Sequence, residues 1–179
     1  MNKFNLIKTD RLLIRTLEME DKDEFFKYRS LSEVYKFQTW KPKDINEIKN
    51  FICKNVAVNL NTPNTWLQLA ICLKTGELIG DFGIHFLDDN FQVEIGITIS
   101  PTYQGNGYAI EASKGVISYL FHDLNKHRVT ASVDPQNNKS INLLESLNLR
   151  KEAHFIKSFR IEAKWYDDCI YAILEDEWV

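Results

Sequence analysis

A short turn with two glycines, Gln104-Gly105-Asn106-Gly107-Tyr108-Ala109, has the clearest chemical pattern in the sequence. The alternating β-branched run from Ile97 to Ile99 stops at Pro101, and a long amphipathic stretch begins at Gly107. A strand, a glycine turn and a helix in this order aim backbone N–H groups and the helix dipole at one point. Such a point attracts an anion, most often a phosphate. The alternative is a plain β-to-α connection in which the glycines only ease the turn.

Length and composition predict one domain covering residues 1–179. The 179 residues are 44% hydrophobic and 26% charged, which is ordinary for a globular protein. A formal net charge of -3 leaves no basic excess, so nucleic-acid binding is not expected as the main activity. Neither a membrane span nor a signal-peptide core is visible in the sequence, and we expect a cytoplasmic protein without a membrane partner.

Three cysteines, Cys53, Cys72 and Cys169, are far apart and form no CxxC pair. This spacing predicts buried free thiols in a reducing compartment and no metal site.

Hydrophobic periodicity predicts an α+β fold with about seven strands. Three consecutive strands are joined by short turns, which favours an antiparallel meander. Asp44 and Glu47 form a helix-start signal, and Asn148 is expected to end a helix with a positive φ. The expected strands cover 12–17, 66–72, 78–86, 91–99, 128–133 and two stretches between 152 and 174, and the expected helices cover 20–29, 45–56, 109–124 and 137–148.

Three nucleotide-binding patterns compete for the glycine turn. A P-loop would end in Gly-Lys-Ser/Thr, which is absent, and a Rossmann fingerprint would need a small residue where Ile110 stands. The third pattern is the coenzyme A cradle Gln/Arg-x-x-Gly-x-Gly/Ala, which Gln104, Gly107 and Ala109 satisfy.

These residues and several other motifs resemble the GNAT superfamily of N-acetyltransferases, and within it the RimJ/RimL branch of ribosomal-protein N-terminal acetyltransferases. The likeness covers nearly the whole chain and rests on the order and spacing of its pieces. It implies a mixed, mostly antiparallel sheet with helices on both faces, splayed near its fourth strand, with acetyl-CoA lying in the opening. The motifs are Thr9-Asp10-Arg11-Leu12-Leu13-Ile14-Arg15, Glu94-Ile95-Gly96, Pro101, Gln104 to Ala112, His127-Arg128-Val129, Asp134-Pro135-Gln136-Asn137 with Ser140, Trp165-Tyr166-Asp167 and Glu177-Trp178.

The resemblance assigns cofactor contacts to two segments. Backbone amides of Gly105, Asn106, Gly107, Tyr108 and Ala109 would bind the pyrophosphate, with Gln104 shaping the cradle. Pantetheine is an extended amide chain, so it can pair with an open strand edge as a peptide does. The backbone of Ile97 and Ile99 is the expected partner, with both side chains in the core.

Glu94 is the expected catalytic base, because acetyl transfer needs a neutral amine and a nearby carboxylate can accept its proton. Strand alternation puts Glu94, Gly96 and Thr98 on one face. The alternative is a cross-strand ion pair or a solvated carboxylate.

Asn137 and Ser140 match the family's Asn-x-x-Ser at the next helix start. Asn137 would bind pantetheine, and Ser140 would protonate the departing thiolate. Helix capping is the alternative for both. Many family members carry a tyrosine donor further along this helix, but Leu144 occupies that position here.

Other polar and aromatic residues have weaker signals. Tyr35, Phe37 and Trp40 either line an acceptor pocket or pack in the core, and His85 and His127 are expected to be structural. Asp167 and Asp168 are explained by turn formation.

The leading hypothesis is an acetyl-CoA-dependent N-acetyltransferase acting on a protein N-terminus or a small amine by direct attack in a ternary complex. The alternative is a non-catalytic acyl-CoA sensor or protein-docking module. A monomer and a homodimer are both compatible with the sequence.

Overall fold

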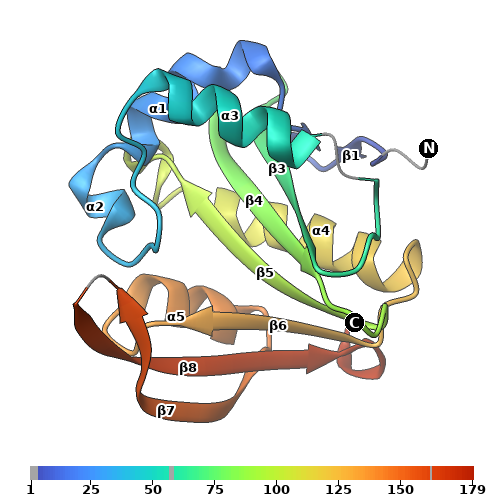
Figure 1. Cartoon of the computed structure of the whole chain (residues 1–179). Helices are drawn as coiled ribbons and strands as arrows, with labels where there is room; N and C mark the ends of the chain where they lie inside the picture. Colours follow the sequence, from blue (N-terminus) through green and yellow to red (C-terminus); the bar gives the residue numbers. More distant parts are fainter. Residues whose placement is uncertain (1–3, 57–58, 162) are drawn as a thin grey trace.

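One eight-stranded sheet, in the order β1-β2-β3-β4-β5-β6-β8-β7, organises the computed structural model, which describes residues 4–56, 59–161 and 163–179 (Figure 1). The starting residues 1–3, where no signal-peptide core is expected, lie outside these ranges. Neighbouring strands are antiparallel except for β5 and β6, which are parallel. The strands are β1 Ile7–Lys8, β2 Leu12–Thr16, β3 Thr65–Leu73, β4 Leu78–Phe86, β5 Gln92–Ile99, β6 Arg128–Val133, β7 Arg150–Ile161 and β8 Lys164–Leu174.

This sheet confirms the predicted mixed, mostly antiparallel α+β fold, with one strand more than the seven expected. The additional strand is β1, where Ile7 pairs with Ile14 of β2. A strand of two residues is too short to produce a periodic pattern, so β1 could not be predicted from the sequence.

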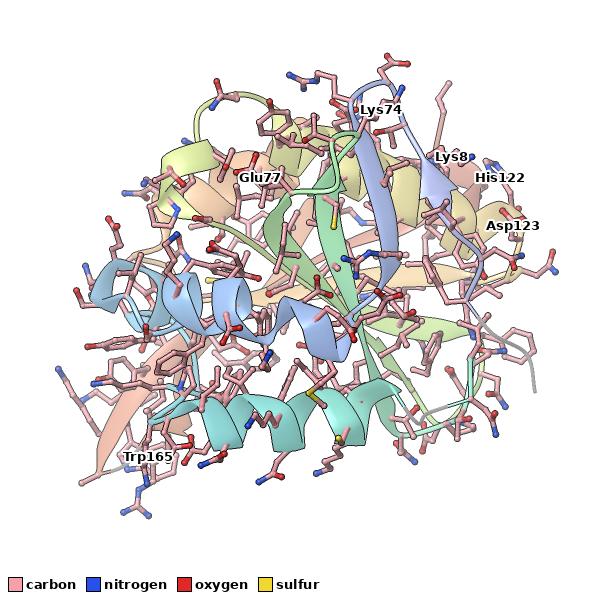
Figure 2. All side chains as sticks on the ribbon, turned by 90° about the horizontal axis from the view of Figure 1, so that it is seen from above. Lys8, Lys74, Glu77, His122, Asp123 and Trp165 are labelled. Atoms are coloured by element: carbon pink, nitrogen blue, oxygen red, sulfur yellow. The ribbon has the colours of Figure 1, made fainter. Side chains whose placement is uncertain are left out.

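Helices cover both faces of the sheet (Figure 1). Helices α1 and α3 lie side by side over one face, as the view from above also shows (Figure 2), and α4 packs on the other. Four of the helices were expected, whereas the short α2 was not. The helices are α1 Lys22–Arg29, α2 Ser32–Tyr35, α3 Ile45–Val56, α4 Tyr108–His122 and α5 Asn138–Ser146, with 3-10 turns at Met19–Asp21, Pro101–Tyr103 and Glu175–Glu177.

Local chemistry explains where these helices begin and end. The Asp44 carboxylate accepts hydrogen bonds from the backbone N–H groups of Asn46 (2.7 Å) and Glu47 (3.1 Å), so it caps α3. Asn148 follows α5 with a φ of 62°, which confirms its predicted left-handed conformation.

The strands β5 and β6 separate along their length. Strand β5 corresponds to the fourth of the seven strands expected from the sequence, because β1 was not expected. They pair only at Gln92–Arg128, Val93–Val129 and Glu94–Thr130. Beyond Glu94, β5 stays paired with β4, and β6 stays paired with β8 (Figure 1). The predicted splay is therefore an opening between β5 and β6.

Two of the three cysteines are buried, as expected, but Cys53 is exposed. It lies on α3, whose buried side is occupied by Ile48 and Ile52. The expectation of a third buried thiol was wrong because the helical phase turns position 53 to the surface.

A buried ion pair fastens α1 to β4. Asp81 is 0% exposed, and its two carboxylate oxygens each lie 3.0 Å from Nε of Arg29. The same guanidinium donates to Oε1 of Gln38 at 3.3 Å, so it also holds the loop after α2.

We expect Arg29→Leu to lower the free energy of unfolding by about 3–5 kcal/mol, because it leaves the Asp81 charge buried without its partner. Urea unfolding measures this change. The double variant Arg29→Leu/Asp81→Leu removes both charges and should recover much of the loss, and Lys27→Met, which removes an exposed pair with Glu24, should change little. An Arg29→Leu protein as stable as the Lys27→Met control would contradict this account.

Candidate functional site

The open edge of β5 presents backbone groups toward the gap. The N–H of Ser100 donates to the carbonyl of Ile79 on β4 (2.9 Å), whereas the carbonyl of Val93 accepts from Oγ1 of Thr130 on β6 (3.1 Å). Backbone groups alternate in direction along a strand. Odd-numbered residues of β5 therefore direct N–H and C=O toward β6, and beyond residue 94 toward the opening.

Ile97 and Ile99 are such odd-numbered residues. Their side chains face the core on the α4 side, where Ile99 is 6% exposed and Ile97 packs against the buried cluster. The Ile99 carbonyl already accepts a hydrogen bond from Nε2 of Gln104 at 2.9 Å. Pairing with an extended ligand thus rests on the Ile99 N–H and on both backbone groups of Ile97.

The glycine turn lies between β5 and α4. Gly105 and Gly107 have φ values of 80° and 78°, a left-handed conformation that favours glycine. The Asn106 side chain donates to the carbonyls of Tyr103 and Gln104, both at 3.2 Å. The turn is therefore held in a fixed shape immediately before α4, whose first turn offers N–H groups to an anion.

Two cations that the sequence analysis missed approach this turn. Nη1 of Arg11 donates to the carbonyl of Asn106 (2.9 Å), and Nζ of Lys139 donates to Oε1 of Gln104 (2.9 Å). Arg11 lies in the family-like motif 9–15 and its partner Glu111 lies in the motif 104–112, but only the fold brings the two residues together. Charge of this sign beside the turn suits a bound pyrophosphate.

Glu111 holds Arg11 in place. Its carboxylate accepts from Nε and the backbone N–H of Arg11 (2.6 and 2.7 Å) and from Oγ1 of Thr9 (2.6 Å). Partial burial favours a higher pKa for Glu111, but the hydrogen bonds from Thr9 and Arg11 outweigh it and lower the pKa. The carboxylate therefore stays ionised and keeps the turn and the chain start together.

Glu94 stands in a cross-strand row on the α1 and α3 side of the sheet. The register aligns Trp66 of β3, His85 of β4, Glu94 of β5 and Thr130 of β6. Nδ1 of His85 lies 3.6 Å from Oε2 of Glu94, so the ion-pair alternative for Glu94 is partly realised.

The neighbouring cross-strand row on the same face contains two glycines. It aligns Gln68, Gly83 and Gly96, and a Cβ added to Gly96 would meet no atom within 4 Å. At Gly83 the added atom would come within 3.2 Å of the Trp66 ring and 3.3 Å of the Gln68 amide. Trp66 and Gln68 thus cover Gly83, while the space above Gly96 stays open beside Glu94.

A cavity of about 400 Å³ brings four of the predicted residues together: Glu94, Ile97, Asn137 and Ser140. Ile99 and the turn 104–109 are not among the residues lining it. Oδ1 of Asn137 accepts from the Ser140 N–H at 3.3 Å, so the capping alternative is realised as well. Leu144 also lines the cavity, where the family's tyrosine would stand.

Residues 36–39 border the cavity on the α2 side. Of the three aromatic residues proposed for an acceptor pocket, Phe37 lines the cavity. Trp40 instead stacks on Phe51, with ring centroids 4.5 Å apart, in the core beneath α1 and α3. Tyr35 is not among the lining residues, and Nζ of Lys41 lies 4.4 Å above its ring.

Asp167 and Asp168 lie inside β8 and line the cavity, so turn formation does not explain them. Asp168 accepts from Oγ of Ser132 at 2.6 Å, and Asp167 contacts Nε2 of His154 at 2.9 Å. The expectation failed because an Asp-Asp pair is typical of turns, whereas here these cross-strand partners hold it within a long strand.

In the described parts of the chain, no group of three or more His, Cys, Asp or Glu side chains is arranged to hold a metal ion. None of the helices in the same ranges is long and apolar enough to cross a membrane.

Several known proteins are similar to this chain in sequence and in fold. A family model described as an acetyltransferase (GNAT) domain matches residues 11–150. The uncharacterized N-acetyltransferase YnaD of Bacillus subtilis (strain 168) is 33% identical over 172 residues, which are 96% of this chain and 98% of that protein. A crystal structure of a GNAT-family acetyltransferase from Bacillus anthracis has a TM-score of 0.88 at 30% identity and covers 97% of this chain and 100% of its own.

Relatives also include ribosomal-protein N-acetyltransferases, as the predicted branch requires. The [ribosomal protein uS5]-alanine N-acetyltransferase of Escherichia coli (strain K12) is 30% identical over 84 residues, which are 47% of this chain and 43% of that enzyme. The resemblance found in the sequence is thereby confirmed.

We expect Gly96→Val to reduce acetyl transfer at least tenfold, because its side chain enters the open space beside Glu94. Stability should not fall, since a β-branched residue suits a strand better than glycine. Thiol release from acetyl-CoA and thermal unfolding measure the two effects. Gly96→Ala is the matched control and should lose less activity, and equal, undiminished rates for both variants would show that nothing binds there.

Proposed function

This chain is an N-acetyltransferase of the GNAT family, and we propose that it transfers the acetyl group of acetyl-CoA to a primary amine by direct attack in a ternary complex. The amine is a protein N-terminus or a small amine. One observation carries the proposal: a single cavity joins the open edge of β5 to Glu94 on one side and to Asn137 and Ser140 on the other.

The geometry of the chain supports a proposed set of cofactor contacts. GNAT acetyltransferases use acetyl-CoA, which supplies a thioester carbonyl for attack. In our proposal the N–H groups of residues 105–109 bind the pyrophosphate, supported by Arg11 and Lys139. The backbone of Ile97 and the N–H of Ile99 pair with pantetheine, and the Asn137 amide binds it from α5.

The amine enters from the side of Phe37 and Trp66. Four acidic residues, Glu94, Asp134, Asp167 and Asp168, line the cavity, and such a surface attracts an ammonium group. Glu94 accepts one proton from the ammonium, which leaves a neutral nitrogen with its lone pair. A backbone N–H near Ile99 stabilises the negative charge that develops on the carbonyl oxygen.

The nitrogen then bonds to the carbonyl carbon as the carbon–sulfur bond breaks. Ser140 donates its hydroxyl proton to the departing thiolate. The nitrogen, positively charged after attack, loses its second proton to water, and water returns one proton to the Ser140 oxygen, so the step ends with a neutral amide and a thiol. Its backbone N–H caps α5 with Asn137, which leaves the hydroxyl group available for this role. The capping hydrogen bond between Asn137 and Ser140 thus keeps the Asn137 amide and the Ser140 hydroxyl on the same side of the cavity.

Thiol release tests the proposed activity. The assay uses peptides with a free N-terminus, the same peptides with a blocked N-terminus and an internal lysine, and polyamines, while calorimetry measures CoA binding. We expect CoA to bind and at least one acceptor class to release thiol. CoA binding without transfer to any acceptor would favour an acyl-CoA sensor, and the absence of both would overturn the proposal.

The variants Glu94→Gln and Ser140→Ala should distinguish proton removal from the amine from proton donation to the thiolate. Glu94→Gln should lower the rate by about 10²-fold or more and change the pH profile, because glutamine cannot accept the proton. Ser140→Ala should lower kcat and leave the acidic limb of that profile in place. Initial rates between pH 6 and 10, with CoA affinity from calorimetry, measure both effects.

Neither variant should alter CoA affinity by much. Glu33→Gln on α2 and Ser146→Ala at the end of α5 are matched controls outside the cavity lining. An unaltered pH profile in Glu94→Gln would remove Glu94 from the role of base. A full rate in Ser140→Ala would show that the thiolate leaves without an acid.

A further inference from the structure

His85 lies directly behind Glu94 in the cross-strand row. Its Nδ1 atom is buried, makes no hydrogen bond among the described residues, and lies 3.6 Å from Oε2 of Glu94. That separation is an ion-pair distance, and a small movement of the flexible Glu94 side chain would close it to a hydrogen bond. His85 does not line the cavity, whereas Glu94 does.

Packing fixes the ring of His85 in this orientation. The indole of Trp66 stacks on it, with ring centroids 4.7 Å apart and planes 6° from parallel. The side chain of His85 is still 23% exposed, although Nδ1 is covered. One edge of the ring therefore faces Glu94, and another part of it is in contact with solvent.

Other groups around Glu94 do not offer the same route. Within the described ranges, His85 is the only basic side chain within 4 Å of the Glu94 carboxylate. From β3, the facing side chains are the uncharged Trp66 and Gln68, and from β6 the facing residue is Thr130. The remaining charged or titratable groups on the cavity wall are Lys36, Asp134, Tyr166, Asp167 and Asp168.

Two of those carboxylates are occupied elsewhere. Asp167 contacts His154 and the Lys157 N–H, and Asp168 accepts from Ser132. These carboxylates attract the protonated amine, but as carboxylates they are no stronger bases than Glu94 and so are not expected to take the proton from it. His85 is the neighbour that can.

We propose that His85 is a positioning residue that takes over the proton which Glu94 removes from the amine. This role rests on the proposed function of Glu94. The proton passes from the amine nitrogen to the Glu94 carboxylate and from there to Nδ1 of His85. The nitrogen keeps its electron pair, Glu94 becomes a carboxylate again, and the imidazolium carries the charge.

The relay solves a problem of access. When acetyl-CoA and the amine fill the cavity, the face of Glu94 toward the cavity is covered by substrate. His85 lies on the neighbouring strand, outside the cavity lining, and can hold the proton until product leaves. The imidazolium then gives the proton to water, and the pair returns to its starting state.

Histidine NMR tests the coupling without any acetyl transfer. In ¹⁵N-histidine-labelled protein with CoA present, we expect the midpoint of the His85 titration to move to lower pH in Glu94→Gln. A shift of about half a unit or more is expected, because the neutral glutamine no longer favours the imidazolium. His154, which pairs with Asp167, is the internal control and should not move.

This measurement separates the two proposals. An unchanged His85 midpoint would overturn the relay even if the protein is an active acetyltransferase. A shifted midpoint would support the coupling even if no acceptor has yet been found.

Two substitutions of His85 separate proton transfer from packing. His85→Phe keeps a flat ring against Trp66 but has no nitrogen, and His85→Asn keeps an N–H near Glu94 but loses the stack. We expect both variants to lower kcat by about tenfold and to alter the acidic limb of the pH profile. Acetyl transfer to the best acceptor from the thiol-release assay, with CoA affinity as the folding control, provides the readout.

If stacking alone matters, His85→Phe will keep the full rate and the wild-type pH profile, and only His85→Asn will lose activity. That result would overturn the relay.

Discussion

Pairing between β5 and β6 stops after Glu94–Thr130, and both halves of the site depend on this separation. Each strand keeps its other neighbour: Ile99 still pairs with Gly80 of β4, and Val133 with Cys169 of β8. The two facing edges are left with backbone groups that need partners, because an unpaired polar group away from water is costly. An extended ligand rich in amides, as we propose for pantetheine, would satisfy them. The opening would then select its ligand through backbone chemistry before any side chain takes part.

The buried Arg29–Asp81 pair fixes one wall of the cavity at this opening. Removing two charges from water costs much of what their attraction returns, so the pair is weak support for stability as such. Its value is positional, because one guanidinium joins α1, the centre of β4 and, through Gln38, the loop that borders the cavity. Phe37 lies next to Gln38 in that loop. A shift of Arg29 would therefore move the cavity wall and not only the helix.

The sequence contained most of this arrangement where the signal is local. The glycine turn, the Asp44 cap and the positive φ of Asn148 each depend on a few neighbouring residues, and the structure has all three. The His85–Glu94 contact depends on the register between β4 and β5, which periodicity does not specify. Arg11 and Glu111 are 100 residues apart, and the packing of α4 against β1 and β2 brings them together. Asp167 and Asp168 are residues typical of turns, but contacts with His154 and Ser132 on the neighbouring strands hold them within β8.

Alternation along β5 explains how one strand serves several tasks. The even-numbered residues Glu94 and Gly96 border the cavity on the α1 and α3 side of the sheet. Odd-numbered side chains such as Ile95 and Ile99 fill the core against α4, and the odd-numbered backbone groups face the opening. A slip of one residue would put isoleucines where Glu94 and Gly96 now stand and would put the carboxylate in the core. The buried isoleucines therefore specify the position of Glu94 as firmly as they specify the sheet. Chemistry and packing on this strand are set by the same register, so neither can change without the other.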